Sequence, residues 1–163
     1  MARLYQIRIV WEGPFRIQEV VRKKSDGGCH PKYDGEDYGL YQIYGKHILS
    51  GPETLLYVGQ TTDQTFSGRF RQHFKEWLRR EEGIEIYLGR VYDPLKHHEK
   101  DNWNTWEMDI KLAEQIIIYK YSPNYNNRSI TNAPSLSPHK RVHLVHDGRP
   151  NKLKHKDYAP DDF

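Results

Sequence analysis

The stretch 103–121, WNTWEMDIKLAEQIIIYKY, places one acid among hydrophobic residues. Its apolar side chains recur at the spacing of one helix face, which predicts an α-helix over these residues. Glu114 falls in the middle of the apolar face. An unpaired carboxylate on a buried face is costly, so we expect Glu114 to be paired, protonated or bound to a metal.

The composition is typical of one folded domain with a polar surface. The chain has 163 residues, of which 36% are hydrophobic and 13% aromatic, and its net charge of +3 permits a nucleic-acid partner without requiring one. Cys29 is the only cysteine, so no internal disulfide can form. The sequence lacks a signal-peptide pattern and a run of about 18 apolar residues. We therefore expect a soluble, cytoplasmic protein with no membrane partner.

Alternating and helical patterns predict the order of the elements. Strands are expected at 4–11, 38–44, 54–58 and 84–92, and helices at 15–24, 67–82 and 103–121. A return strand is the alternative for 15–24. The strands 38–44 and 54–58 are expected to form a hairpin with a long polar connection, and 25–37 and 93–102 are expected to be loops. Residues 128–156 carry seven Lys or Arg residues and one acid, which predicts a solvated basic tail before an acidic end that includes Asp157.

Polar residues follow one another in a distinctive order around the Glu114 helix. In chain order the set is Gly39-Leu40-Tyr41, Tyr57-Val58-Gly59, Arg69, His73, Glu114, Pro123 and Asn126. Arg69 and His73 are one helical turn apart, on a polar stripe beside the apolar stripe of their helix. Each motif alone is common, whereas the ordered set is specific.

This set resembles the GIY-YIG nuclease superfamily over residues 38–127. The resemblance implies an α+β fold with a small three-stranded antiparallel sheet flanked by helices. To this fold the chain adds an amino-terminal strand and helix in 1–37, packed on the nuclease core of 38–127, and a basic extension in 128–163. The resemblance also implies metal-dependent hydrolysis of DNA phosphodiester bonds.

The resemblance implies a catalytic set of Tyr41, Tyr57, Arg69, His73, Glu114 and Asn126. Arg69 suits this chemistry because its guanidinium stays charged and forks onto phosphate oxygens. Glu114 suits Mg²⁺ or Mn²⁺, because one carboxylate with several waters is an ordinary Mg²⁺ site. Asn126 is expected to hold the helix end, the carboxylate or a water in place.

The general base is open between Tyr41 and His73. The resemblance assigns this role to Tyr41, but a free phenol titrates near pH 10, so a nearby cation would have to lower its pKa. His73 titrates nearer neutral pH, and it also suits a phosphate contact or the acid for the leaving group.

The chain departs from the family pattern in three places. Leu40 and Val58 stand where the motifs have isoleucine, which is conservative. Gln60 stands where some members have a lysine, so one phosphate contact is absent or comes from another basic side chain. The connection between the two motifs is longer than in compact members. The expected nucleic-acid contacts are Gln60, Arg69, Arg71, Arg128, Lys140 and Arg141.

The expected function is that of an endonuclease acting on DNA with Mg²⁺ or Mn²⁺, as a monomer or homodimer. A catalytically silent nucleic-acid-binding module on the same fold is one alternative. The same chemistry on RNA, or on branched or damaged DNA, is another.

Overall fold

The computed structural model describes residues 3–21, 38–92, 103–126 and 140–159. Its elements in chain order are β1 (Arg3–Phe15), α1 (Ile17–Val21), β2 (Gly39–His47), β3 (Gly51–Thr61), α2 (Phe66–Glu76), the 3₁₀ helix η3 (Leu78–Arg80), β4 (Glu85–Tyr92), α3 (Trp103–Tyr121), β5 (Lys140–Gly148) and β6 (Lys156–Tyr158). The predicted loops at 25–37 and 93–102 lie outside the described residues.

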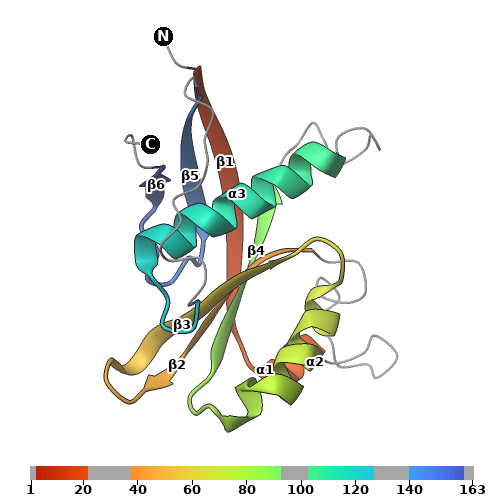
Figure 1. Ribbon diagram of the computed structural model, residues 1–163, viewed down its shortest axis with the longest axis vertical. Coiled ribbons are helices and arrows are strands. Elements are labelled where there is room, and N and C mark those ends of the chain that lie inside the picture. The colour runs from red at the N-terminus through yellow and green to blue at the C-terminus, as the bar shows by residue number, and fades with distance from the viewer. Residues whose placement is uncertain (1–2, 22–37, 93–102, 127–139, 160–163) are drawn as a thin grey trace.

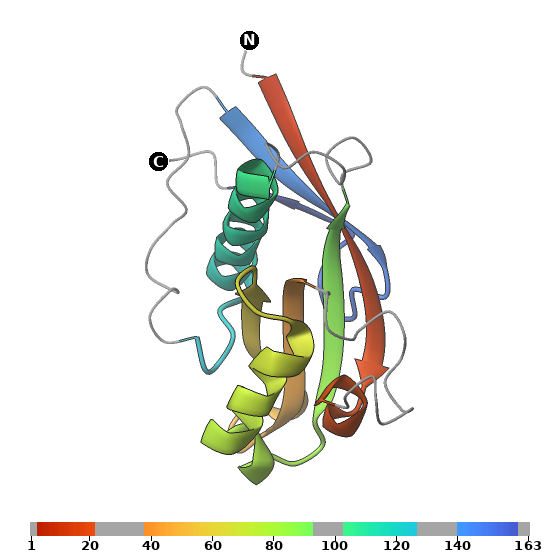
Figure 2. The ribbon, with the colours of Figure 1, turned by 90° about the vertical axis from the view of Figure 1, so that its right-hand side faces the viewer.

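The strands form one curled mixed sheet in the order β3-β2-β4-β1-β5-β6 (Figure 1). β1 pairs antiparallel with β4 and parallel with β5. The predicted small three-stranded antiparallel sheet is therefore wrong, because β3, β2 and β4 form only half of a six-stranded sheet. Without β1, the edge of β4 would expose a row of unpaired backbone groups, and the amino-terminal strand satisfies them. Figure 2 shows β1 and β4 side by side along the molecule.

The predicted solvated tail is also wrong for the residues that form β5 and β6. Residues 142–146 of β5 are all buried, with Val142 and Leu144 in the hydrophobic core, whereas Arg141 before them is exposed. The apolar residues Val142, Leu144 and Val145 are present in the sequence, but the many cations around them conceal a short strand. A parallel partner far away in the chain gives no local signal of its own.

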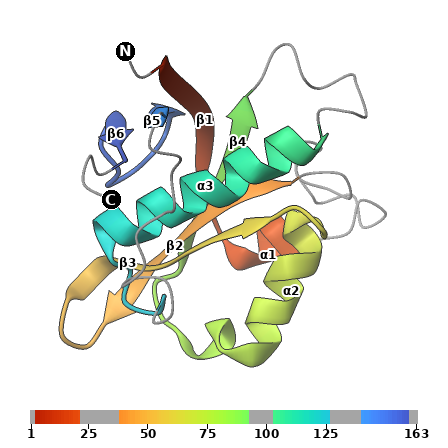
Figure 3. The same cartoon turned by 45° about the horizontal axis from the view of Figure 1, so that its top comes forward.

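Helices cover both faces of the sheet. Successive side chains of β2 point to opposite faces, so Leu40 joins the hydrophobic cluster under α3, while Tyr41 joins the cluster under α1 and α2. Figure 3 shows α3 crossing over the strands, with α1 and α2 grouped at one end of the molecule. The site residues therefore come from elements on both faces of the same strands.

The remaining predicted elements are largely recovered. A helix over 103–121 is confirmed at both ends, and 15–24 contains the helix α1. The long polar connection at 45–53 is wrong, because β2 and β3 continue through it until His47 pairs with Gly51. The predicted helix 67–82 is shorter, because α2 ends at Glu76 and η3 follows.

Candidate active site

Tyr41 and Tyr57 lie on the neighbouring strands β2 and β3 and face α2. Their rings stack with centroids 6.0 Å apart. Tyr41 is paired with Gly59 in the strand register, and a Cβ atom on Gly59 would collide with the Tyr41 phenol oxygen. The glycine of the second motif therefore leaves the space that the tyrosine of the first motif occupies.

Helix α2 brings Arg69 and His73 to the Tyr41 oxygen. The helix begins where the Thr65 side chain accepts a hydrogen bond from the Gly68 backbone. His73 Nε2 lies 2.7 Å from the Tyr41 phenol oxygen, and Arg69 Nε donates to the same oxygen at 3.3 Å. Far from lying on an open polar stripe, His73 is only 3% exposed.

Burial governs the proton affinity of both aromatic groups. Burial, together with the charge of Arg69, lowers the pKa of His73 to about 4, so the ring is neutral at pH 7. Burial and the neighbouring Tyr57 raise the pKa of the Tyr41 phenol, while the hydrogen bond from Arg69 and its charge lower it. A fixed cation thus offsets part of the cost of a buried phenolate.

Glu114 lies on α3, half-buried, within electrostatic range of Tyr41 and Arg69. The backbone of Gln60 on β3 favours the ionised form of this carboxylate and so lowers its pKa. Burial raises the pKa of Glu114 to about 7, opposed chiefly by the charge of Arg69. Among the described residues Glu114 has no ion-pair partner. Burying its ionised form without a paired charge therefore costs free energy, and a bound cation would lower this cost.

These residues fit a cation site of the single-carboxylate kind. The Glu114 carboxylate lacks an ion pair, and Gln60 Oε1 is buried with no hydrogen-bond partner. Both groups offer oxygen, the ligand atom that Mg²⁺ prefers. The described part of the chain contains no group of three or more His, Cys, Asp or Glu side chains that could hold a metal ion. Glu114 is therefore the carboxylate that would hold a cation, with water and substrate as the other ligands.

Asn126 is committed to the backbone of β3. Its side chain accepts from the Val58 N–H at 2.9 Å and donates to the Val58 C=O at 2.8 Å. Next to it, the backbone N–H of Tyr125 donates to the C=O of Leu56 at 2.8 Å. Of the roles expected for Asn126, these bonds perform the first: they hold the chain that leaves α3 against the strand that carries Tyr57.

The expected nucleic-acid contacts are scattered. Arg71 donates through Nε and Nη2 to the C=O of Val21 at 3.1 and 2.7 Å, so its guanidinium closes the end of α1. Lys140 and Arg141 begin β5, on the far side of the sheet from β3. Arg128 lies outside the described residues. Among the members of this group that the structure describes, only Gln60 and Arg69 lie beside Tyr41 and Glu114.

Sequence reasoning missed Trp77. Its indole Nε1 donates to His73 Nδ1 at 3.1 Å, on the opposite side of the ring from Tyr41. Trp77 continues the apolar spacing of α2, and such a pattern gives no partner for the indole N–H. The available signal was its position four residues after His73, since residues at this spacing share a helix face.

No protein-family model matches the chain, and no curated protein or solved structure matches it significantly. Of the helices that the structure describes, none combines the length and the apolar character needed to cross a membrane.

Proposed function

We propose that the chain is a GIY-YIG-type endonuclease that hydrolyses DNA phosphodiester bonds with Mg²⁺ or Mn²⁺. The observation that supports it is the convergence of Arg69 and His73 on the Tyr41 oxygen, beside the half-buried acid Glu114. These groups come from β2, α2 and α3, and the burial and charge around them shift their pKa values, as is common at catalytic sites.

The four groups match the demands of phosphodiester hydrolysis. A water must lose a proton as its oxygen attacks phosphorus, the bond to the leaving oxygen breaks, and negative charge on the phosphate must be stabilised. The Tyr41–His73 pair takes the proton from water, and the leaving oxygen receives a proton from solvent. Arg69 offers a fixed positive charge to the phosphate.

Glu114 would hold the divalent cation. When bound, the cation supplies positive charge that stabilises the phosphate and the leaving oxygen. Tyr57 stacks on Tyr41 and keeps its ring in place, and Asn126 fixes the far edge of β3. DNA is the proposed partner, with a monomer or homodimer as the active form and the cytoplasm as its location.

A plasmid assay tests the role of Glu114. The wild-type chain is incubated with supercoiled DNA and Mg²⁺, beside Glu114→Ala and the control Glu107→Ala, which removes an acid on the same helix that is paired with Lys111. We expect wild type and Glu107→Ala to nick the plasmid and Glu114→Ala to lose at least about a hundredfold in rate. Equal nicking by all three would remove Glu114 from the mechanism.

The substrate class needs a separate panel. Cleavage of RNA, branched DNA or damaged DNA in preference to plasmid would keep the chemistry and change the substrate. Tight DNA binding without metal, with no cleavage of any substrate in the panel, would contradict the nuclease and favour a silent binding module.

A further inference from the structure

Trp77 extends the chain of hydrogen bonds that ends at Tyr41. It follows α2, and both its backbone N–H and its indole N–H contact His73: the first donates to the His73 C=O at 3.0 Å, and the second to Nδ1 at 3.1 Å. The indole packs against the rings of Tyr57 and Tyr125, with centroids 6.1 and 5.4 Å away. These two ring contacts help to fix its direction toward His73.

An indole nitrogen can only donate a hydrogen bond, so His73 Nδ1 must be the acceptor. In a neutral imidazole the other nitrogen then carries the hydrogen. His73 Nε2 therefore donates to the Tyr41 oxygen at 2.7 Å, and Arg69 Nε donates to it as well. Two N–H groups thus point at one phenol oxygen.

We infer that Trp77 is a positioning residue, whose indole N–H keeps the His73 proton on Nε2 and so leaves Tyr41, rather than His73, to take the proton from water. The consequence for catalysis rests on the proposed nuclease function, whereas the position of the proton does not. For this step Tyr41 must first lose its proton to solvent, which burial and the neighbouring Tyr57 oppose, and the phenolate then regains a proton from the attacking water. His73 and Arg69 stabilise the phenolate by donating to it.

Glu76 makes the indole necessary. Its Oε2 lies 4.0 Å from His73 Nδ1, on the exposed side of α2. Without the indole N–H, this carboxylate favours a proton on His73 Nδ1, because an ionised carboxylate can only accept a hydrogen bond. His73 Nε2 would then accept from the Tyr41 hydroxyl and hold the phenol in its neutral form.

Nitrogen NMR of the histidine side chains tests the inference directly. In the wild-type chain we expect His73 to carry its proton on Nε2, and in Trp77→Phe to carry it largely on Nδ1. His146 serves as an internal reference, because its Nδ1 accepts from Trp11 at 2.9 Å and its Nε2 faces Asp157 at 3.1 Å. Its Nε2–H form should persist in both proteins.

Plasmid cleavage gives the functional readout. We expect Trp77→Phe to lower the maximal rate roughly fivefold, the effect of one hydrogen bond, with the concentration of DNA at half-maximal rate unchanged. If Trp77→Phe fails to fold, benzothienylalanine at position 77 keeps the bicyclic shape and removes only the N–H. Glu76→Gln in the Trp77→Phe background should restore part of the rate, which a purely structural role of Trp77 would not produce.

The outcomes separate this inference from the proposed function. A wild-type His73 that carries its proton on Nδ1 overturns the inference, whether or not DNA is cut. A changed tautomer in Trp77→Phe with an unchanged cleavage rate overturns the positioning role. An Nε2–H His73 in a wild-type chain that cuts no substrate contradicts the nuclease and supports the assigned tautomer.

Discussion

The molecule contains the same series of hydrogen-bonded groups twice, and the two copies end differently. In each, an indole donates to a histidine Nδ1, and the histidine Nε2 faces an oxygen. The site relay consists of Trp77, His73 and Tyr41, and the core relay consists of Trp11, His146 and Asp157. Both histidines are buried, at 3% and 1% exposure, so burial alone does not distinguish a chemical role from a structural one.

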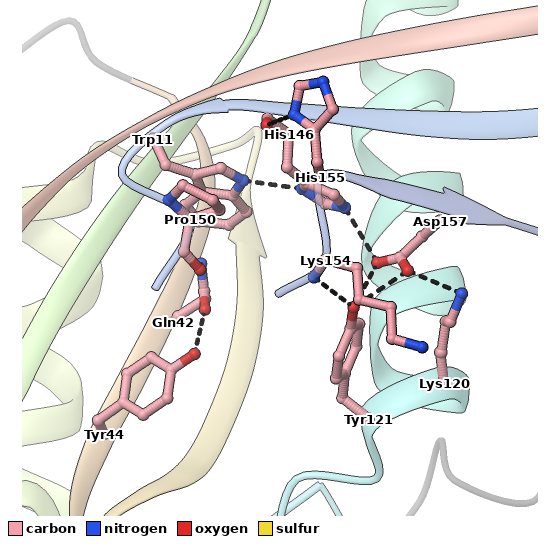
Figure 4. A network of polar contacts seen from close by, with 10 residues as sticks. All are labelled: Trp11, Gln42, Tyr44, Lys120, Tyr121, His146, Pro150, Lys154, His155 and Asp157. Atoms are coloured by element: carbon pink, nitrogen blue, oxygen red, sulfur yellow. Dashed lines mark hydrogen bonds and ion pairs between the residues drawn. The ribbon is translucent and has the colours of Figure 1, made fainter. Parts of the chain in front are cut away.

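The core relay ends on an acid whose oxygens are fully used (Figure 4). Asp157 is 0% exposed, accepts from the Tyr121 hydroxyl at 2.8 and 3.0 Å and pairs with Lys120 at 2.7 Å. Burial alone would raise the pKa of Asp157, but hydrogen bonds from His146, Lys120 and Tyr121 outweigh it and lower the pKa. Such an acid binds strands together and has no oxygen left for a ligand.

The acid beside the site relay is in the opposite condition. Burial raises the pKa of Glu114 to about 7, and among the described residues the acid has no ion-pair partner. The number of hydrogen bonds and ion pairs that a buried acid makes, more than its degree of burial, thus indicates whether the acid stabilises the fold or binds a ligand.

Removing the core acid gives the largest expected effect. Asp157→Ala leaves Lys120 and His146 facing an empty site, so we expect the free energy of unfolding to fall by about 3–5 kcal/mol. Urea denaturation measures it. Asp147→Ala is the control, because Asp147 pairs with Arg8 at the surface and should cost under about 1 kcal/mol. Equal losses in the two variants would contradict the structural role of the core relay.

The site relay should respond in rate more than in stability. Tyr41→Phe removes the oxygen on which Arg69 and His73 converge, and we expect plasmid cleavage to fall about a hundredfold or more, equivalent to about 3 kcal/mol. The control is Tyr44→Phe on the same strand, whose buried hydroxyl donates to Gln42 at 2.6 Å. Cleavage should persist in the control, and an unchanged rate in Tyr41→Phe would exclude the phenol as the base.

Ionised Glu114 should destabilise the folded protein when no metal is bound. The pKa of Glu114 is about 7 in the folded chain against its ordinary value of 4.5, so the folded state binds more protons between these values and stability falls as pH rises from about 4.5 to 7. Glu114→Gln should therefore be more stable than wild type at pH 8 by about 1–3 kcal/mol and equal to it near pH 4.

Thermal unfolding with and without Mg²⁺ tests whether Glu114 binds the cation. Added Mg²⁺ should raise the melting temperature of wild type and leave Glu114→Gln unchanged. An Mg²⁺ effect of the same size in both proteins would place the cation elsewhere.

The smallest effect is expected at the edge of β3. Asn126→Ala removes two hydrogen bonds to the Val58 backbone, and we expect a loss of about 1–2 kcal/mol in urea denaturation. Asn124→Ala is the control, because the Asn124 side chain bonds only the exposed Ser50 hydroxyl at 3.2 Å. A loss in Asn124→Ala as large as in Asn126→Ala would contradict the role of the Asn126 amide.

Local patterns predicted what local forces determine. The helix of Glu114 was predicted to the residue, because its apolar period and its stop at Ser122-Pro123 are both in the sequence. The neighbourhood of Tyr41, Arg69 and Glu114 came from the order of motifs, without any physical account of their contacts.

Distant pairing could not be predicted in the same way. The parallel partner of β1 lies in β5, more than 130 residues away in the chain, and nothing near either strand specifies the other. Asp157 looked like part of an acidic end, because its three donors come from α3 and β5 and meet only in the folded chain. Trp77 had an apolar spacing that concealed a polar contact.

The ion pair at the carboxy-terminal end of α3 indicates how much of the chain is needed to hold this helix. Lys120 and Tyr121 occupy the final turn of the helix that carries Glu114. Lys120 forms an ion pair with Asp157 on β6, and the Tyr121 hydroxyl donates a hydrogen bond to it. A fragment trimmed to residues 38–127 would retain every motif of the nuclease resemblance, yet its long helix would lack this anchor. The carboxy-terminal strands thus help to hold in place the helix that carries Glu114.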